Sequence, residues 1–213
     1  MPIRAVFFDV AHTLLYKPAV LPAIHEVMRS HGLDVPFEEF CARHAIVMDA
    51  TDFPDRTDRS FYRGFNAAVL RSLGCVPTAD MLEAIFEASA YQPWVPYDDV
   101  AAIAAFPLPR GVLSNWDLTL KEKLGSLLGV DFEWILGSAE AGTRKPQEEF
   151  FRLALEATRL KAAEIAYVGD SMKLDIEPAT AMGFRAILLD RQSLYPHASV
   201  PRIVSLTELG ALV

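Results

Sequence analysis

Five short apolar runs constrain the fold of this 213-residue chain more than any other feature. The runs occupy residues 3–8, 111–113, 134–136, 165–168 and 184–189. Runs of this length, each ending at a polar or small residue, are typical of buried strands. Helical patterns near 118–128, 147–159 and 174–182 alternate with the later runs, which predicts parallel βαβ units. We therefore expect an α/β fold in which a Rossmann-like parallel sheet carries helices on both faces.

The segment between the first two predicted strands has a different pattern. Residues 16–98 contain about four amphipathic helical stretches and no clear strand, with apolar side chains three or four positions apart. We expect two domains: a core made of residues 1–15 and 99–213, and an all-helical insert made of residues 16–98.

Composition restricts the partners of the chain. The net charge is −8 and no run of Lys or Arg stands out, which argues against nucleic acid and anionic membranes as partners. No apolar run approaches the roughly 20 residues of a membrane span, and the first residues lack a signal-peptide layout. Cys41 and Cys75 are read as thiols in a reducing compartment. We expect a cytoplasmic protein that acts on a small molecule.

Polar residues gather at the expected carboxyl ends of the strands, where parallel α/β sheets bind ligands. Asp9 ends the first strand and begins the sequence Asp-Val-Ala-His-Thr-Leu. The later polar stations, in chain order, are Ser114-Asn115, Lys145-Pro146, and Gly169-Asp170-Ser171 followed by Asp175. We expect these side chains to meet at one edge of the sheet.

In their order and placement, these stations resemble the four motifs of the haloacid dehalogenase superfamily, over the whole chain apart from the details of the insert. The position of the insert is similar to that of the family's helical cap. The resemblance implies that Asp9 is the nucleophile, because a carboxylate can form an aspartyl intermediate. It also implies a Mg²⁺ ion held by the carboxylates of Asp9 and Asp170 and by the backbone carbonyl of Ala11, with Asp175 beside them.

Other residues are expected to bind the substrate. A hydroxyl at Ser114 and an ammonium at Lys145 can hold phosphoryl oxygens and offset the charge of the transition state. Asn115 is expected to orient this group, and Thr13 matches the family threonine that supports the turn after the nucleophile. In the insert we expect the loop at residues 52–56 to face the substrate through Arg56.

The chain departs from the family pattern at Ala11. Family phosphatases place a second Asp there, two residues after the nucleophile, which protonates the leaving group and later activates water. General acid–base help typically contributes about 10²–10⁴-fold, and its loss matters most for poor leaving groups such as alkoxides. His12 is a candidate replacement because an imidazole titrates near neutral pH, although a simple turn residue is the favoured interpretation.

Four functions follow from this departure. The favoured one is a Mg²⁺-dependent phosphohydrolase of small phosphorylated metabolites that works through an aspartyl phosphate. Phosphonatase-like relatives also carry Ala two residues after the nucleophile, but they need a cap lysine, and the insert has only Lys17, at its hinge. A 2-haloacid dehalogenase needs no leaving-group acid, yet Asp170 fits the metal-binding phosphatases better. A non-catalytic phospho-ligand-binding member is opposed by the retention of Asp9 and Lys145.

Overall fold

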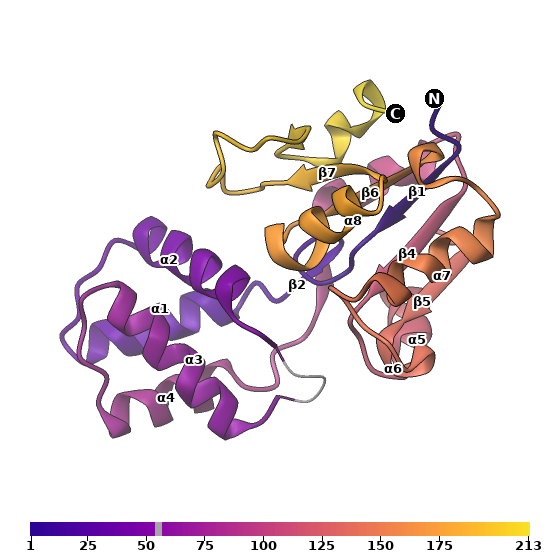
Figure 1. The fold of residues 1–213 in the computed structure, drawn as a ribbon. Coiled ribbons are helices and arrows are strands. Elements are labelled where there is room, and N and C mark those ends of the chain that lie inside the picture. The colour runs from indigo at the N-terminus through magenta and orange to yellow at the C-terminus, as the bar shows by residue number, and fades with distance from the viewer. Residues whose placement is uncertain (54–56) are drawn as a thin grey trace. The chain divides into compact units, whose positions relative to one another are not determined.

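The computed structural model describes residues 1–53 and 57–213 and divides into two compact units (Figure 1). The first unit comprises Met1–Tyr16 and Val95–Val213, and the second comprises Lys17–Trp94. The chain crosses from the first unit to the second and back through two short strands, β2 (Leu15–Tyr16) and β3 (Val95–Pro96). These strands pair with each other in antiparallel fashion, so the two crossings lie side by side.

A six-stranded sheet forms the centre of the first unit, and every strand pair in it is parallel. Its spatial order is β5-β4-β1-β6-β7-β8. The strands are β1 (Ala5–Phe8), β4 (Arg110–Ser114), β5 (Trp134–Gly137), β6 (Ile165–Gly169), β7 (Arg185–Leu189) and β8 (Arg202–Ile203). The predicted α/β class is confirmed, whereas β8 escaped prediction because two residues carry no readable period.

The strand order reverses around β1. The chain proceeds outward from β1 to β4 and β5, then returns to the other side of β1 for β6, β7 and β8. Such a switch point leaves a crevice beyond the carboxyl ends of the central strands, where ligands bind in sheets of this kind. Asp9 follows β1 directly and therefore lies at this point.

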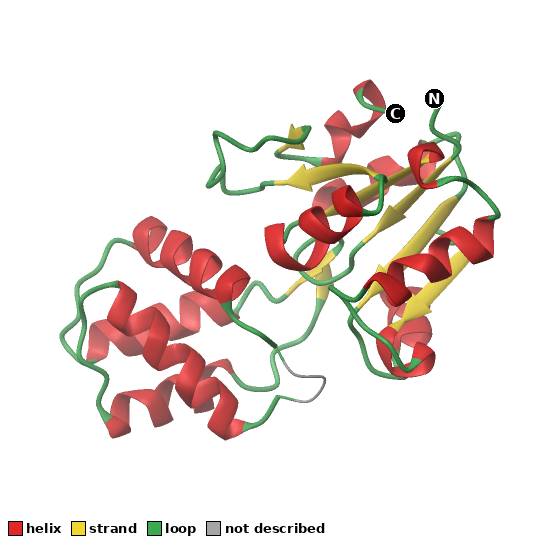
Figure 2. Ribbon diagram, viewed as in Figure 1, coloured by secondary structure: helices red, strands yellow, loops and turns green. Residues whose placement is uncertain are grey.

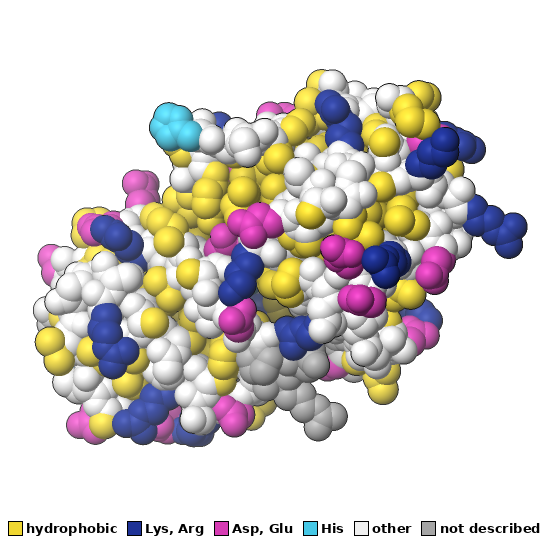
Figure 3. All heavy atoms as spheres, in the orientation of Figure 1, with side chains coloured by type: hydrophobic (Ala, Val, Ile, Leu, Met, Phe, Trp, Pro, Cys, Tyr) yellow, Lys and Arg dark blue, Asp and Glu magenta, His cyan; other side chains and the backbone are white. Residues whose placement is uncertain are grey.

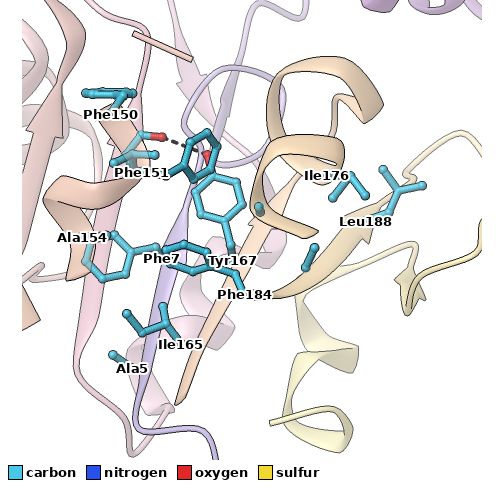
Figure 4. Packing of buried hydrophobic residues seen from close by; sticks show 13 residues of the cluster. Ala5, Phe7, Phe150, Phe151, Ala154, Ile165, Tyr167, Ile176, Phe184 and Leu188 are labelled. Atoms are coloured by element: carbon cyan, nitrogen blue, oxygen red, sulfur yellow. Dashed lines mark hydrogen bonds between the residues drawn. The ribbon is translucent and has the colours of Figure 1, made fainter. Parts of the chain in front are cut away.

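Both faces of the sheet are buried. All four residues of β1 are inaccessible to solvent, and because successive side chains point to opposite faces, the sheet must be covered on each side. On one face, α7 (Glu148–Thr158) and α8 (Glu177–Ala181) contribute to a cluster around Phe7 and Tyr167 (Figure 4). Figure 2 shows helices on either side of the strands.

Shorter helices complete the first unit. They are η1 (Asp98–Ala105), α5 (Leu120–Leu127), α6 (Ser138–Ala141), η2 (Ala162–Glu164), a single π-helical turn η3 (Met172–Ile176) and η4 (Leu206–Ala211). Isolated π-helical turns are uncommon and are frequently found at functional sites. The turn η3 follows β6 and contains Asp175.

The described part of the second unit contains four helices. They are α1 (Val20–Ser30), α2 (Phe37–Ala50), α3 (Arg59–Ser72) and α4 (Ala79–Ser89). The side chains of Asp58 and Thr78 cap the first turns of α3 and α4 by accepting backbone N–H bonds. The helices bury a shared apolar cluster that includes Met28, Phe40 and Ile85.

The distribution of charged side chains and the state of the two cysteines can be described for each part of the chain. Basic and acidic side chains are interspersed on the face drawn in Figure 3. Cys41 and Cys75 are both free thiols, partly buried against the apolar cluster of the second unit. Among the described residues, no helix combines the length and the apolarity needed to cross a membrane.

A glycine in β4 gives a test of core packing. A Cβ added at Gly111 would overlap with the ring of Phe7 in the neighbouring strand. We expect Gly111→Ala to lower the free energy of unfolding by about 1–3 kcal/mol through overpacking, measured by urea denaturation. Gly125→Ala is the control, because Gly125 lies in α5 with open space around it and should gain about 0.5–1 kcal/mol in helix propensity. Equal effects of the two substitutions would contradict the packing argument.

Candidate active site

Asp9 is held at the switch point by the backbone of its neighbour strand. Its N–H donates to the carbonyl of Val168 in β6 at 2.9 Å, so the ladder extends one residue past β1. The chain then turns sharply, with the N–H groups of Leu14 and Leu15 both bonded to the carbonyl of Val10. His12 occupies the left-handed region at φ 62° within this turn. Ala11 and His12 thus both lie in the turn that directly follows Asp9.

Two donors converge on one oxygen of Asp9. Ser114 Oγ donates to Asp9 Oδ1 at 2.9 Å, and Lys145 Nζ donates to the same oxygen at 2.5 Å. Ser114 is the last residue of β4, the strand next to β1, which explains how it reaches the carboxylate. All three side chains are buried, with Lys145 only 3% exposed. The donors therefore fix the orientation of the predicted nucleophile.

Asn115 fixes the backbone of Lys145. The side-chain amide of Asn115 donates to the Lys145 carbonyl at 3.1 Å, and its oxygen accepts the Lys145 N–H at 2.8 Å. This reciprocal pair joins the loop after β4 to the loop that carries the lysine. These two bonds fix the Lys145 backbone, while the expected part of Asn115 in substrate binding stays a prediction.

Asp175 is the second partner of Lys145. Its Oδ1 accepts from Lys145 Nζ at 2.7 Å and from the hydroxyl of Tyr167 at 2.9 Å, and its Oδ2 accepts from the Ser171 N–H at 3.1 Å. A Cβ at residue 169 would overlap with the carboxyl group of Asp175, so this close approach requires Gly169. The helix cap in this region is Ser171, which accepts from Leu174 N–H, while Asp175 itself lies inside the turn.

Tyr167 is a member of the site that the sequence analysis did not single out. It lies in the middle of β6, and the carbonyl oxygen of Leu113 in β4, 3.1 Å from the Tyr167 oxygen, is a second acceptor that shares its one hydroxyl hydrogen with Asp175 (Figure 4). The signal was present: a fully buried tyrosine hydroxyl must find a hydrogen-bond partner, and this one precedes Asp170 by three residues. Its apolar neighbours made it look like an ordinary core residue.

Asp170 completes a cluster of acids. The hydroxyl of Thr13 donates to Asp170 Oδ1 at 3.3 Å, which joins the turn after the nucleophile to the end of β6. Oxygen atoms from Asp9, Asp170 and Asp175 lie within 4.8 Å of one another. Three carboxylates at this separation form a donor set suited to a hard divalent cation.

Burial and neighbouring charges shift the pKa values of the ionisable groups in this cluster. Burial, followed by the neighbouring carboxylates of Asp175 and Asp9, raises the pKa of Asp170 well above its usual range. Burial also raises the pKa of Asp175, although Lys145 opposes the shift. For Lys145, burial favours the neutral amine, but Asp175 and Asp9 outweigh it and raise the pKa of the ammonium. A single lysine cannot neutralise three carboxylates, so a bound Mg²⁺ fits the charge as well as the ligand chemistry.

The structure brings most of the predicted residues together. Seven of the predicted side chains are linked by the contacts described above, namely Asp9, Thr13, Ser114, Asn115, Lys145, Asp170 and Asp175. Ala11 lies in the same turn as Asp9. Arg56, the expected substrate-binding residue of the insert, lies outside the described residues. The chemical roles of all these residues stay predictions.

A family model described as haloacid dehalogenase-like hydrolase matches residues 3–183. The chain belongs to this family. It is 41% identical over 85 residues to a glyceraldehyde 3-phosphate phosphatase of Methanocaldococcus jannaschii, covering 38% of the chain and 36% of that protein. It is 33% identical over 118 residues to a phosphoserine phosphatase of Thermus thermophilus, covering 53% of the chain and 47% of that protein. The chain thus spans less than half the length of these relatives.

Solved structures share the fold over the full chain. A magnesium-bound HAD-hydrolase of Bacillus subtilis has a TM-score of 0.63 at 19% identity, covering 100% of this chain and 99% of the other. The L-2-haloacid dehalogenase of Xanthobacter autotrophicus has a TM-score of 0.59 at 22% identity, covering 99% and 98%. Because the structural likeness includes a haloacid dehalogenase while the relatives named above are phosphatases, the fold alone does not select between phosphorus and halogen chemistry.

The raised pKa of Asp170 predicts how the metal-free protein responds to pH. A carboxyl group with a raised pKa binds its proton more tightly in the folded state, so stability falls as the pH rises from the ordinary aspartate range through the raised value. We expect Asp170→Asn to remove this loss and to stabilise the protein by about 1 kcal/mol at neutral pH in EDTA. Thermal unfolding at several pH values measures the effect.

Asp131→Asn, at an exposed loop position, is the control for the change in net charge. It should leave the pH dependence as it is in the wild type. A lower stability of Asp170→Asn in EDTA would show that an ionised Asp170 does not reduce the stability of the metal-free protein.

Proposed function

We propose that the protein is a Mg²⁺-dependent phosphohydrolase that acts on a small phosphorylated metabolite through an aspartyl phosphate on Asp9. The convergence of Ser114 and Lys145 on one oxygen of Asp9 carries this proposal. The two phosphatases described above support it, and so does the cluster of Asp9, Asp170 and Asp175.

The nucleophile is oriented before the substrate arrives. With Oδ1 held by two donors, the Asp9 carboxylate is aimed for in-line attack on phosphorus. In the first step a bond forms between the carboxylate and phosphorus while the bond from phosphorus to the leaving oxygen breaks. In the second step water attacks the same phosphorus, the bond to Asp9 breaks, and inorganic phosphate leaves with the carboxylate restored.

Charge on the transferring group is offset by the same donors. Lys145 stays an ammonium because its pKa is raised, so it can donate to a phosphoryl oxygen as well as to the carboxylates. Asp9 and Asp170, with the backbone carbonyl of Ala11, would hold Mg²⁺, while Asp175 has three donors of its own and holds Lys145 in place. The bound ion would neutralise charge on the phosphoryl oxygens.

The leaving group must find its proton elsewhere. The side chain of Ala11 has no proton to give, so a leaving oxygen of low basicity is favoured, such as that of an acyl phosphate or a phenol. We expect Lys17–Trp94 to serve as a cap that limits the access of water and selects the substrate. The adjacent crossings at β2 and β3 suit a movable attachment of this kind.

The direct test is Mg²⁺-dependent release of phosphate from acetyl phosphate and p-nitrophenyl phosphate, measured with Asp9→Asn as the inactive variant. We expect turnover with both substrates and a loss of at least about 10³-fold in the variant, because the amide cannot replace the nucleophile. The fold should be retained, since the oxygen of the substituted amide can still accept the bonds from Ser114 and Lys145. Equal turnover by the variant would exclude Asp9 as the nucleophile.

Halide release from 2-chloropropionate is assayed in parallel with phosphate release. Turnover of the haloacid alone would replace the proposed phosphatase by a dehalogenase. Tight binding of Mg²⁺ and phosphate without turnover of any substrate would instead identify a non-catalytic member of the family.

Restoring the missing acid gives a second prediction. Ala11→Asp should raise kcat/KM on simple alkyl phosphates by about 10–100-fold, because a carboxyl group can protonate the departing alkoxide. The same change should alter kcat/KM on acetyl phosphate by less than about threefold, since an acetate leaving group needs no proton and the later attack of water does not enter kcat/KM. A uniform change across both substrates would show that Ala11 does not mark the position of a leaving-group acid.

A further inference from the structure

Arg191 joins parts of the first unit that are distant in sequence. It follows Asp190, just beyond β7, and its guanidinium group lies 3.8 Å from the ring centroid of Tyr97, which follows β3. Its two terminal nitrogens donate to the two carboxylate oxygens of Asp99, at 2.7 and 2.9 Å. Bidentate pairs of this kind fix geometry as well as adding energy. Arg191 therefore holds the segment where the chain returns from Lys17–Trp94.

Asp99 is itself firmly anchored. Its Oδ2 accepts from the hydroxyl of Ser205 and from the N–H of Leu206, each at 2.9 Å. Burial alone would raise the pKa of Asp99, but the bonds from Arg191, Leu206 and Ser205 lower it below its usual value. The carboxylate thus stays charged as a fixed counter-ion for Arg191.

Arg191 also reaches the turn after the predicted nucleophile. Its Nη2 donates to the carbonyl of Thr13 at 2.9 Å, and the Thr13 hydroxyl in turn donates to Asp170. Tyr97 stacks on Tyr16 with ring centroids 4.1 Å apart, so the outgoing and returning crossings meet near the same guanidinium. One side chain contacts both the turn that carries Asp9 and Ala11 and the start of the return segment.

One atom of Arg191 is left without a partner. Among the described residues, Arg191 Nε is the buried side-chain nitrogen or oxygen that makes no hydrogen bond. A buried unsatisfied donor is unfavourable, and such groups in proteins need a reason for being kept. The bonds of the terminal nitrogens to Asp99 and Thr13 set the orientation of the guanidinium, and that orientation leaves Nε unsatisfied.

We propose that Arg191 is a positioning residue for Mg²⁺: it holds the Thr13 backbone so that the turn between Asp9 and Leu15 and the carboxylate of Asp170 keep the geometry that binds the ion. This inference rests on the proposed function, because it assumes that the site binds the Mg²⁺ ion proposed there. Arg191 does not touch the acidic cluster through any bond described above, and it acts through Thr13. Outer-shell groups that orient metal ligands typically change metal affinity by about 10–100-fold when removed.

The test compares Arg191→Met with Arg202→Met by titration calorimetry with Mg²⁺ alone. Arg202 is a matched control because it also pairs with an aspartate near the end of β7, Asp190, at 2.8 Å, without contacting Thr13. We expect Arg191→Met to weaken Mg²⁺ binding about tenfold and Arg202→Met to leave it within about twofold of the wild type. Equal losses in the two variants, or wild-type affinity in Arg191→Met, would overturn the inference.

Two milder variants keep the test decisive if Arg191→Met does not fold. Arg191→Lys keeps the charge but cannot bond Asp99 through two nitrogens while also reaching Thr13, so we expect a loss of affinity between those of the wild type and the Met variant. Asp99→Asn should weaken Mg²⁺ binding in the same direction, because the guanidinium loses its charged anchor. Unchanged affinity in both folded variants would reject the role of Arg191.

The readout separates this inference from the proposed function. A wild-type protein that binds Mg²⁺ but releases no phosphate from any substrate would refute the phosphohydrolase, while the Arg191 comparison would still be decided by affinities alone. A wild-type protein that does not bind Mg²⁺ would overturn both. Where phosphate is released, Arg191→Met should need about tenfold more Mg²⁺ for half-maximal rate than the wild type.

Discussion

The buried ion triad of Asp9, Lys145 and Asp175 is the interaction on which the rest of the site depends. Each charge has been taken out of water, so each is tolerable only in the company of the others. Lys145 bonds both carboxylates, Ser114 supports one of them, and Tyr167 supports the other. Removing Lys145 would leave two buried carboxylates without a counter-charge, so this one ammonium ties the integrity of the core to the integrity of the site.

Several residues close to the triad fix the positions of its side chains. Gly169 leaves room for the Asp175 carboxyl group, and the π-helical turn that follows places that group inside the protein instead of on its surface. Asn115 clamps the lysine backbone from the next loop. Asp170 adds a further acid beside Asp9 and Asp175, and burial together with these two carboxylates raises its pKa, so we expect it to lower the stability of the metal-free fold at neutral pH. A cation-binding site is a plain physical reason for accepting such a cost.

With Ala11 in place of an acid, the proposed reaction depends more on how readily the substrate's leaving group departs without a proton. The residues predicted to attack and to stabilise charge are brought together in this chain, whereas the position predicted for the leaving-group acid holds Ala11. Stabilisation of the phosphoryl group and protonation of the leaving oxygen are separable contributions to the barrier. Under the proposed function, an arrangement that keeps the first contribution and omits the second is expected to favour substrates whose leaving group departs as a stable anion.

The α/β class, the five longer strands and the helical periodicity of the insert could be predicted from the sequence alone, because periodicity is a local signal. Strand-end position likewise predicted which polar side chains would meet at one edge of the sheet. The sequence could not determine the parts that depend on contacts between distant segments. The strand β8, the role of Tyr167 and the contacts of Arg191 belong to this second class. In the sequence, Tyr167 is one residue of an apolar run and Arg191 is one residue of a loop. Folding brings Tyr167 to Asp175, and it brings Arg191 to Thr13 and Asp99. These contacts become visible only in the folded chain, because hydrogen bonds and ion pairs act over a few ångströms in space, whatever the separation along the sequence.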